Sequence, residues 1–336
     1  MTSITSTETP ATDLAENYAL KVRGAKKLEQ SDKRFFWLTM GSAIAVLLIF
    51  VGVFAALLNG AWPALREFGL PFFYTQKWNP VTEKFGILAP IYGTLITSAL
   101  AMLFAVPIGI GVAIFLTEIC PRALRRSIGI AIELLAGIPS IIYGIWGLFV
   151  FAPFFQQYIQ PHMIEFLSPI PGIGILFEGP PYGIGTFTAS LILAIMILPL
   201  ISSITRDVFD TVPPMLKEAG YGLGCTTWEV IWNIVLPYTR NGVVGGAMLA
   251  LGRALGETMA VTFVIGNAHK ISASLFHPAT TISAAIANEF SEAVGDLYLS
   301  SLLAAGFFLF IITFVVLAAA QWMLASLDKA AGGNKK

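Results

Sequence analysis

The sequence predicts an all-α membrane protein with six transmembrane helices. Of its 336 residues, 56% are hydrophobic and only 12% are charged, and the mean hydropathy of +0.76 is too high for a soluble globule. A helix needs about 20 apolar residues to cross a hydrocarbon core about 30 Å thick. The apolar runs in this chain reach that length and do not alternate with polar residues, which excludes the strands of a membrane β-barrel.

The apolar runs define the elements in chain order. They cover residues 35–58, 85–117, 127–155, 184–204, 241–266 and 297–326. We expect one membrane domain at 35–326, with an N-terminal arm at 1–34 and a tail at 327–336. Residues 268–296 connect the last two spans. Apolar residues recur at helical spacing within 281–292, which suggests a half-helix that lies on the membrane or dips into it.

Prolines interrupt several of the predicted spans. They stand at Pro90, Pro107, Pro139 and Pro199. A proline within a helix kinks it and frees a carbonyl, which a bilayer tolerates only where neighbouring helices or water supply a partner. The bundle is therefore expected to surround a polar path.

Lysine and arginine gather in alternate connections. The N-terminal arm, the connections after the second and fourth spans, and the tail are basic, whereas no Lys or Arg occurs between Phe154 and Gly183. By the positive-inside rule, both termini and the connection at residues 206–237 face the cytoplasm. Residues 268–296 then lie on the outer side.

The connection at residues 206–237 is polar and rich in glycine. It contains Glu218-Ala219-Gly220-x3-Gly224-x9-Ile234-x-Leu236-Pro237. Pro213 and Pro214 can open a short helix that the glycines end. Thr226 and Glu229 have the spacing of a capping box for a second short helix, and Pro237 is expected to stop that helix. An amphipathic connector lying on the membrane is the alternative interpretation.

A charged pair lies near the middle of the fifth span, in Gly252-Arg-Ala-Leu-Gly-Glu-Thr-Met-Ala-Val261. Arg253 and Glu257 are four residues apart, so on a continuous helix they share a face, which is also the small-residue face, and can pair. Exposing such an arginine to lipid costs about 2.5–3.5 kcal/mol, which favours an inward position. The pair is either a structural pin or an oxyanion site in which Glu257 holds Arg253 until an anion arrives.

Other polar residues have simpler interpretations. Glu133, about two turns into the third predicted span, is either paired or functional, and Glu118 has the spacing to pair with Arg122 on the surface. The histidines lack metal-ligand spacing, so no metal site is expected. No Gly-x4-Gly-Lys-Ser/Thr loop occurs, so this chain is not itself an ATPase, and no catalytic residue is predicted.

These motifs together resemble a known family. The loop at residues 206–237 resembles the EAA loop of binding-protein-dependent ABC importer permeases, with Gly220 where many members carry a second alanine. The segment Gly252 to Val261, together with Glu133-Leu-Leu-Ala-Gly-Ile-Pro-Ser-Ile-Ile-Tyr-Gly144, resembles PstC-type permease subunits of the phosphate-specific ABC importer. The resemblance covers all six spans and implies the type I ABC importer permease fold.

The resemblance also implies partners in the inner membrane and on both sides of it. These are a PstA-like sister permease, a PstB-like ATPase dimer that uses ATP and Mg, and a periplasmic phosphate-binding protein, in contact with membrane lipid and without nucleic acid. No cofactor is expected on this chain itself. An ion-coupled secondary transporter of an oxyanion, or an ABC permease for sulfate or molybdate, remains an alternative.

The resemblance assigns roles to particular residues. Phosphate passage is implied at Arg253 and Glu257. Contact with the ATPase is implied for the motif residues of the 206–237 loop, which are Glu218, Ala219, Gly220, Gly224, Ile234, Leu236 and Pro237.

Overall fold

The computed structural model describes the backbone of residues 11–331 and the side chains of 32–323 and 325, apart from that of residue 122. Within this range the regular structure is helical except for one isolated bridge between Asn79 and Lys84, which confirms the all-α prediction. Residues 1–10 of the predicted arm and 332–336 of the predicted tail lie outside the described residues. The chain forms two compact units, residues 1–56 and 57–336.

The first long helix, α1 (Ala11–Phe68), begins in the first unit and ends in the second. Its segment Asp32–Phe68 is long and apolar enough to cross a membrane. Large apolar side chains from Phe35 to Val53 are exposed along it, as expected for a helix that faces lipid. Within the second unit, the Ser300 hydroxyl of α14 donates to Gly60 O at 2.8 Å and accepts from Ala64 N at 2.9 Å. These bonds hold the end of α1 against α14.

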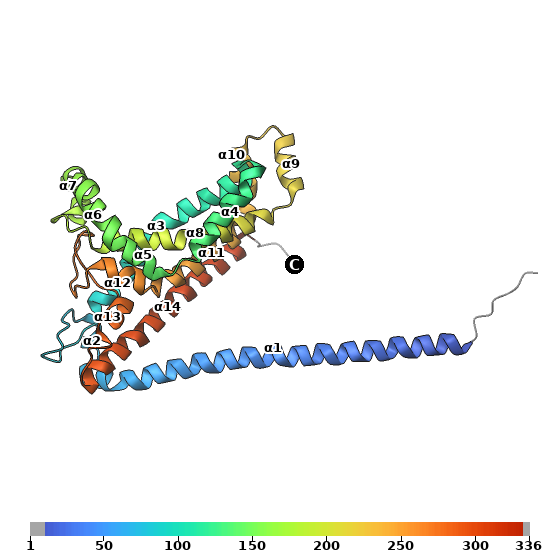
Figure 1. Cartoon of the computed structure of the whole chain (residues 1–336), viewed down its shortest axis with the longest axis horizontal. Coiled ribbons are helices and arrows are strands. Elements are labelled where there is room, and N and C mark those ends of the chain that lie inside the picture. The colour runs from blue at the N-terminus through green and yellow to red at the C-terminus, as the bar shows by residue number, and fades with distance from the viewer. Residues whose placement is uncertain (1–10, 332–336) are drawn as a thin grey trace, which may run out of the picture. The chain divides into compact units, whose positions relative to one another are not determined.

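The second unit contains the other helices. They are α2 (Pro71–Tyr74), α3 (Leu88–Ile114), α4 (Arg122–Ala136), α5 (Ser140–Trp146), α6 (Ala152–Phe154), α7 (Gln160–Leu167), α8 (Thr186–Asp210), α9 (Pro214–Gly222), α10 (Thr227–Val230), α11 (Leu236–Leu255), α12 (Met259–Ile265), α13 (Ile282–Glu289) and α14 (Asp296–Ala331). Helices α3, α8 and α11 contact one another at the centre. In this unit α9 and α10 lie at one end, and α2, α7 and α13 lie towards the other (Figure 1).

Six membrane spans fit the structure when one bent pair of helices counts as a single span. Five segments pass by length and hydropathy alone, namely Asp32–Phe68, Leu88–Ile119, Ser140–Leu167, Thr186–Asp210 and Asp296–Met323. The sixth consists of Thr227–Leu255 and Met259–Ile265, which are bent by 60° at the break between them. The predicted number of spans is thus confirmed, and the fifth span is discontinuous.

The third span begins later than predicted. Residues 127–136 belong to α4, an amphipathic helix that ends at Ala136, and the chain turns at Gly137 before α5. Pro139, with a φ of −57°, stands just ahead of α5, where its missing N–H removes no helical hydrogen bond. The span is therefore Ser140–Leu167, and Glu133 precedes it rather than lying inside it.

Close packing of small residues sets the position of α11 on α8. A Cβ atom at Gly242 would lie 2.5 Å from Val208 Cγ1, and one at Gly246 would lie 2.7 Å from Ile204 Cγ2. Ala250 continues this buried face. Arg253, which the sequence placed on the same face, is exposed instead. The small residues bring the two backbones together, and the arginine points elsewhere.

Candidate functional site

The fifth span breaks at the predicted charged pair. Helix α11 ends at Leu255, and α12 begins at Met259 after a bend of 60°. Arg253 therefore lies in the last turn of α11, whereas Glu257 lies in the break. The prediction that the two residues share one helical face is wrong.

The break has a local physical cause. Gly256 is a poor helix former and caps α11. The Glu257 carboxylate accepts a hydrogen bond from Ala260 N at 3.2 Å, the arrangement by which a side chain satisfies a free N–H at the start of a new helix. Glu257 thus stabilises the beginning of α12 instead of pairing along α11.

Arg253 is separate from Glu257 in its interactions. Among the described side chains no ion pair joins the two. The Arg253 guanidinium is exposed in the single chain and lies within electrostatic reach of Tyr143 on α5. The Tyr143 hydroxyl donates to Leu135 O at 2.9 Å. The exposed Arg253 side chain carries a planar fork of N–H donors.

The 206–237 loop folds into two helical pieces around a glycine turn. Pro214 opens α9, and Gly224 has a φ of +87°, in the left-handed region that favours glycine. The predicted capping box is confirmed: Thr226 N donates to Glu229 Oε2 at 2.7 Å, and Glu229 N donates to Thr226 Oγ1 at 3.4 Å.

Pro237 does not stop the second helix, contrary to the prediction. The helix continues from Thr227 to Leu255 through a wider π-helical turn at Ile231–Val235, and Pro237 lies in the first turn of α11. In this turn Leu236 N bonds to Ile231 O rather than to the nearer carbonyl. The wider turn changes the ladder of hydrogen bonds just where the proline ring would otherwise clash. The motif loop and Arg253 are consequently joined by one helical segment.

The motif residues of the loop divide into two groups. Glu218, Ala219, Gly224 and Pro237 are exposed, whereas Gly220 is buried. A Cβ atom at Gly220 would lie 2.7 Å from Ile234 Cδ1, so α9 packs closely on the following helix. Ile234 and Leu236 pack partly buried against a cluster formed by Ala113, Phe209, Val212, Val230, Val235 and Val243. The first group forms a surface, and the second holds it in place.

Large apolar side chains are exposed close to the motif residues in the sequence. Met215, Leu223, Trp228 and Trp232 are all exposed, and the two tryptophan rings stack with centroids 5.6 Å apart. Exposed apolar groups gathered on a loop are typical of a contact surface. None of these four residues belongs to the motif spacing that contains Glu218 and Gly224.

An ion pair fixes α9 to the bundle. Lys217 Nζ lies 2.6 Å from Glu118 Oε1, and the exposed fractions of the two side chains are 19% and 7%. The predicted partner of Glu118, Arg122, has a side chain outside the described residues. Lys217 directly precedes Glu218 of the motif, so this pair sets the orientation of α9. Sequence spacing could not find it, because 99 residues separate the partners.

We expect Lys217→Ala to destabilise the protein, because it leaves the buried Glu118 carboxylate without its partner. Removing one member of a fully buried pair costs about 3–5 kcal/mol, and the partial exposure of Lys217 reduces that figure. The exchange Lys217→Glu with Glu118→Lys should recover most of the loss. Thermal unfolding of the purified chain measures this, with the exposed Lys77→Ala as control. Equal melting temperatures for Lys217→Ala and the control would show that the pair contributes nothing.

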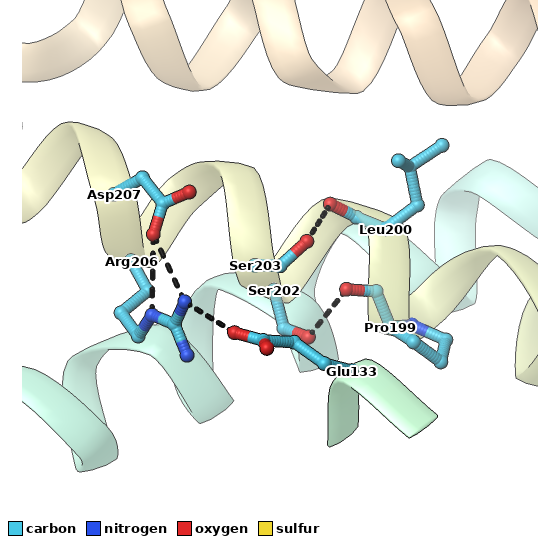
Figure 2. A network of polar contacts seen from close by, with 7 residues as sticks. All are labelled: Glu133, Pro199, Leu200, Ser202, Ser203, Arg206 and Asp207. Carbon is cyan, nitrogen blue, oxygen red and sulfur yellow. Dashed lines mark hydrogen bonds and ion pairs between the residues drawn. The ribbon is translucent and has the colours of Figure 1, made fainter. Parts of the chain in front are cut away.

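A second ion pair places Glu133. Figure 2 shows Arg206 of α8 reaching both Glu133 of α4, at 2.7 Å, and its neighbour Asp207, at 3.0 Å. In the turn after Pro199, the hydroxyls of Ser202 and Ser203 donate to the carbonyls of Pro199 and Leu200, at 3.1 Å each (Figure 2). Glu133 is therefore a paired surface residue that holds α4 on α8.

A buried carboxylate lies at the other end of the second unit, in the connection before the last span. The Glu289 cluster comprises Trp78, His269, Glu289 and Tyr298. Glu289 accepts hydrogen bonds from Trp78 Nε1 at 2.5 Å and Tyr298 Oη at 2.7 Å, and His269 Nε2 lies 2.7 Å from its other oxygen. The Trp78 and His269 rings stack with centroids 5.1 Å apart. Burial raises the pKa of Glu289, but the hydrogen bonds from His269, Tyr298 and Trp78 outweigh it and leave the pKa below its ordinary value.

This lowered pKa predicts an acid-sensitive stabilisation. An ionised Glu289 stabilises the folded state fully above the unfolded-state pKa of about 4.5, and this contribution is lost as the pH falls through the lower folded-state pKa. At pH 7, Glu289→Gln should cost about 1.5–3 kcal/mol, the size of a hydrogen bond to a charged group. Thermal unfolding measured from pH 7 to 3.5 should show that the stability difference between Glu289→Gln and the unmodified chain shrinks as the pH falls. The exposed Glu165→Gln should be neutral, and a difference independent of pH would contradict the prediction.

Comparison with known proteins places this geometry in a family. Residues 105–330 match the family described as "Binding-protein-dependent transport system inner membrane component". A solved bacterial alginate ABC transporter, in complex with a pentasaccharide-bound periplasmic protein, has a chain that superposes with a TM-score of 0.60 at 20% identity, covering 89% of this chain and 98% of that one. A chain of the MetNI methionine ABC transporter gives a TM-score of 0.52 at 17% identity, covering 74% of this chain and 99% of that one. The fold is that of an ABC importer permease, as predicted.

Curated relatives are similar over nearly their whole length. The "Phosphate transport system permease protein PstC" of Mesorhizobium japonicum is 65% identical over 307 residues, which cover 91% of this chain and 94% of that protein. The protein of the same name from Pasteurella multocida is 54% identical, covering 95% and 97%. A "Probable phosphate transport system permease protein PstC" of Methanocaldococcus jannaschii is 36% identical, covering 88% and 95%. The chain therefore belongs to the family of binding-protein-dependent transport system inner membrane components, and within that family to the PstC permeases.

Proposed function

We propose that this chain is the membrane permease subunit of an ATP-driven importer of inorganic phosphate. The observation that carries the proposal is its 65% identity, over 91% of its length, to a protein named as a phosphate transport system permease. The exposed Arg253 guanidinium at the helix break supplies suitable chemistry, because a planar fork of donors and a fixed positive charge suit a phosphate oxyanion.

The exposure of Arg253 supports the inference of a partner permease. Within a lipid bilayer an arginine that faces hydrocarbon costs about 2.5–3.5 kcal/mol. We infer that a PstA-like sister permease covers this side of the chain, so that Arg253 and Glu257 line a translocation path between the two subunits. Glu257 acts there through the break that it stabilises rather than as the ion-pair partner of Arg253.

The exposed surface of the 206–237 loop supports the inference of a partner ATPase. Its exposed Glu218, Ala219 and Gly224, with the apolar Leu223 and Trp228, offer a surface for docking. We infer that a PstB-like ATPase dimer binds there and uses ATP and Mg, so that this chain carries no cofactor of its own. Gly220, Ile234 and Leu236 support that surface from inside. The loop, the arm and the tail are then cytoplasmic, and a periplasmic phosphate-binding protein meets the opposite face, which includes residues 268–296.

Reconstituted transport tests the function. Proteoliposomes containing this chain, the sister permease and the ATPase, supplied with the binding protein outside and ATP inside, should take up radiolabelled phosphate but neither sulfate nor molybdate. A protonophore should leave the initial rate unchanged. Uptake without ATP that collapses with the protonophore would instead establish an ion-coupled secondary transporter.

The orientation is tested separately. A reporter active only outside the cytoplasm should be active when inserted after Val81 or Gly172, in exposed connections, and inactive after Gly222. The expectation follows from the basic residues on the Gly222 side, which the positive-inside rule retains in the cytoplasm. An active fusion after Gly222 would remove the docking role of the loop, because an external loop cannot reach a cytoplasmic ATPase.

A further inference from the structure

Helix α13 is inserted in the second unit rather than lying on its surface. Ile282, Ser283, Ala284 and Ala285 are all buried within the protein. The helix contacts α3, α12 and α14. A half-helix that is this enclosed can hold its neighbours in fixed positions.

The N-terminal end of α13 is fixed to α3. Ile282 N donates to Thr94 Oγ1 at 3.0 Å, and Thr281 Oγ1 caps the helix by accepting from Ala284 N at 3.2 Å. A Cβ atom at Gly93 would lie 2.0 Å from Thr280 O, so only a glycine permits this approach of the two backbones. The position of Ser283, one residue further on, is therefore closely determined.

Ser283 contacts the break of the fifth span. Its hydroxyl donates to the backbone carbonyl of Glu257 at 2.6 Å, and only 6% of the residue is exposed. The Glu257 carbonyl lies between α11 and α12, outside both helices, and a buried carbonyl left unpaired is costly. The bond thus fixes the backbone of Glu257. The carboxylate of this residue stabilises the start of α12, and the residue follows Arg253 closely in the chain.

We propose that Ser283 is a positioning residue for phosphate passage, which acts by holding the Glu257 backbone and so the geometry of the break at Arg253. The proposal rests on the proposed function. Helix α13 has 8 residues and is about 12 Å long, and its other end carries Glu289 in the Glu289 cluster. It therefore joins that cluster directly to the break.

The test compares two buried serines in the assembled importer. Ser283→Ala removes the bond to Glu257, whereas Ser301→Ala removes a hydroxyl that bonds at 2.8 Å only within its own helix, to Leu297 O. Phosphate uptake per assembled complex should fall about three- to ten-fold in Ser283→Ala, the size of one neutral hydrogen bond, and stay unchanged in Ser301→Ala. Ser283→Thr keeps the donor and should restore at least half of the rate. An unchanged rate in Ser283→Ala, an equal loss in Ser301→Ala, or no rescue by Ser283→Thr would overturn the proposal.

A second measurement does not depend on the substrate. A cysteine introduced by Arg253→Cys, with Cys120 and Cys225 replaced by serine, is labelled with a thiol reagent in the purified complex. Adding Ser283→Ala should change the labelling rate at least three-fold, and adding Ser301→Ala should not. If the unmodified complex fails to transport phosphate, the proposed function fails, and the labelling rates still decide the role of Ser283. Equal labelling rates with and without Ser283→Ala would refute that role.

Discussion

Arg253→Gln is expected to reduce phosphate uptake about 100-fold while the permease complex still assembles. A bidentate, charge-assisted contact with an oxyanion contributes about 3 kcal/mol, which corresponds to this factor. Assembly should persist because, among the described side chains, Arg253 makes no ion pair with Glu257. Its removal therefore strands no buried carboxylate. Radiolabelled uptake per assembled complex is the measurement.

Related variants separate charge from geometry at the same position. Arg253→Lys keeps the positive charge but loses the fork and should retain about a tenth of the rate, the loss of one charge-assisted bond. Lys84→Gln removes an exposed cation elsewhere and should have no effect. The double change Arg253→Gln with Glu257→Gln should be no better than the single one. Full recovery in the double variant would establish a purely structural pair and refute anion contact.

Gly224→Leu is expected to abolish both recovery of the ATPase with the permease and phosphate uptake. A φ of +87° is available to glycine at no cost, whereas a leucine there is strained by about 1–2 kcal/mol and would change the turn between α9 and α10. The exposed surface around Glu218 and Trp228 would then lose its shape. Co-purification and uptake are measured at equal membrane levels of the subunit.

Two controls distinguish backbone strain from bulk at Gly224. Gly224→Asn places a residue that tolerates left-handed backbone at the same point and should retain most activity. Gly222→Leu adds the same bulk at a nearby helical glycine, where a Cβ would meet nothing within 4 Å beyond its own local backbone, and should be tolerated by the chain itself. Normal ATPase recovery in Gly224→Leu would mean that the loop is only a connector on the membrane surface.

Residue types and spacing predicted the features that depend on local chemistry. Apolar length predicted the number of spans, Thr226 and Glu229 the capping box, and Pro214 the start of α9. Glycine spacing on α11 indicated close packing, and Gly242 and Gly246 do lie against α8. These properties are decided within a few residues or within one helical face, so the sequence contains them directly.

The errors arose where tertiary contacts or altered hydrogen-bond ladders decide the outcome. A continuous fifth helix was expected because Arg253 and Glu257 have ideal spacing, but the Glu257 carboxylate bonds to Ala260 N instead. Pro237 was expected to end a helix, and a π-helical turn accommodates it. The Lys217 pair with Glu118 and the Ser283 bond to Glu257 join residues distant in sequence, which periodicity cannot detect.

The break between α11 and α12 also places backbone polar groups within a membrane span. An interrupted helix presents backbone N–H and C=O groups that hydrocarbon cannot satisfy. The Ser283 hydroxyl and the Glu257 carboxylate satisfy one group each. Two further bonds lie within the break, from Glu257 N to Ala254 O and from Thr258 Oγ1 to Gly256 O, at 3.3 Å each. A charge beside this break therefore meets polar backbone as well as hydrocarbon, and that polarity is built into the chain before any ion arrives.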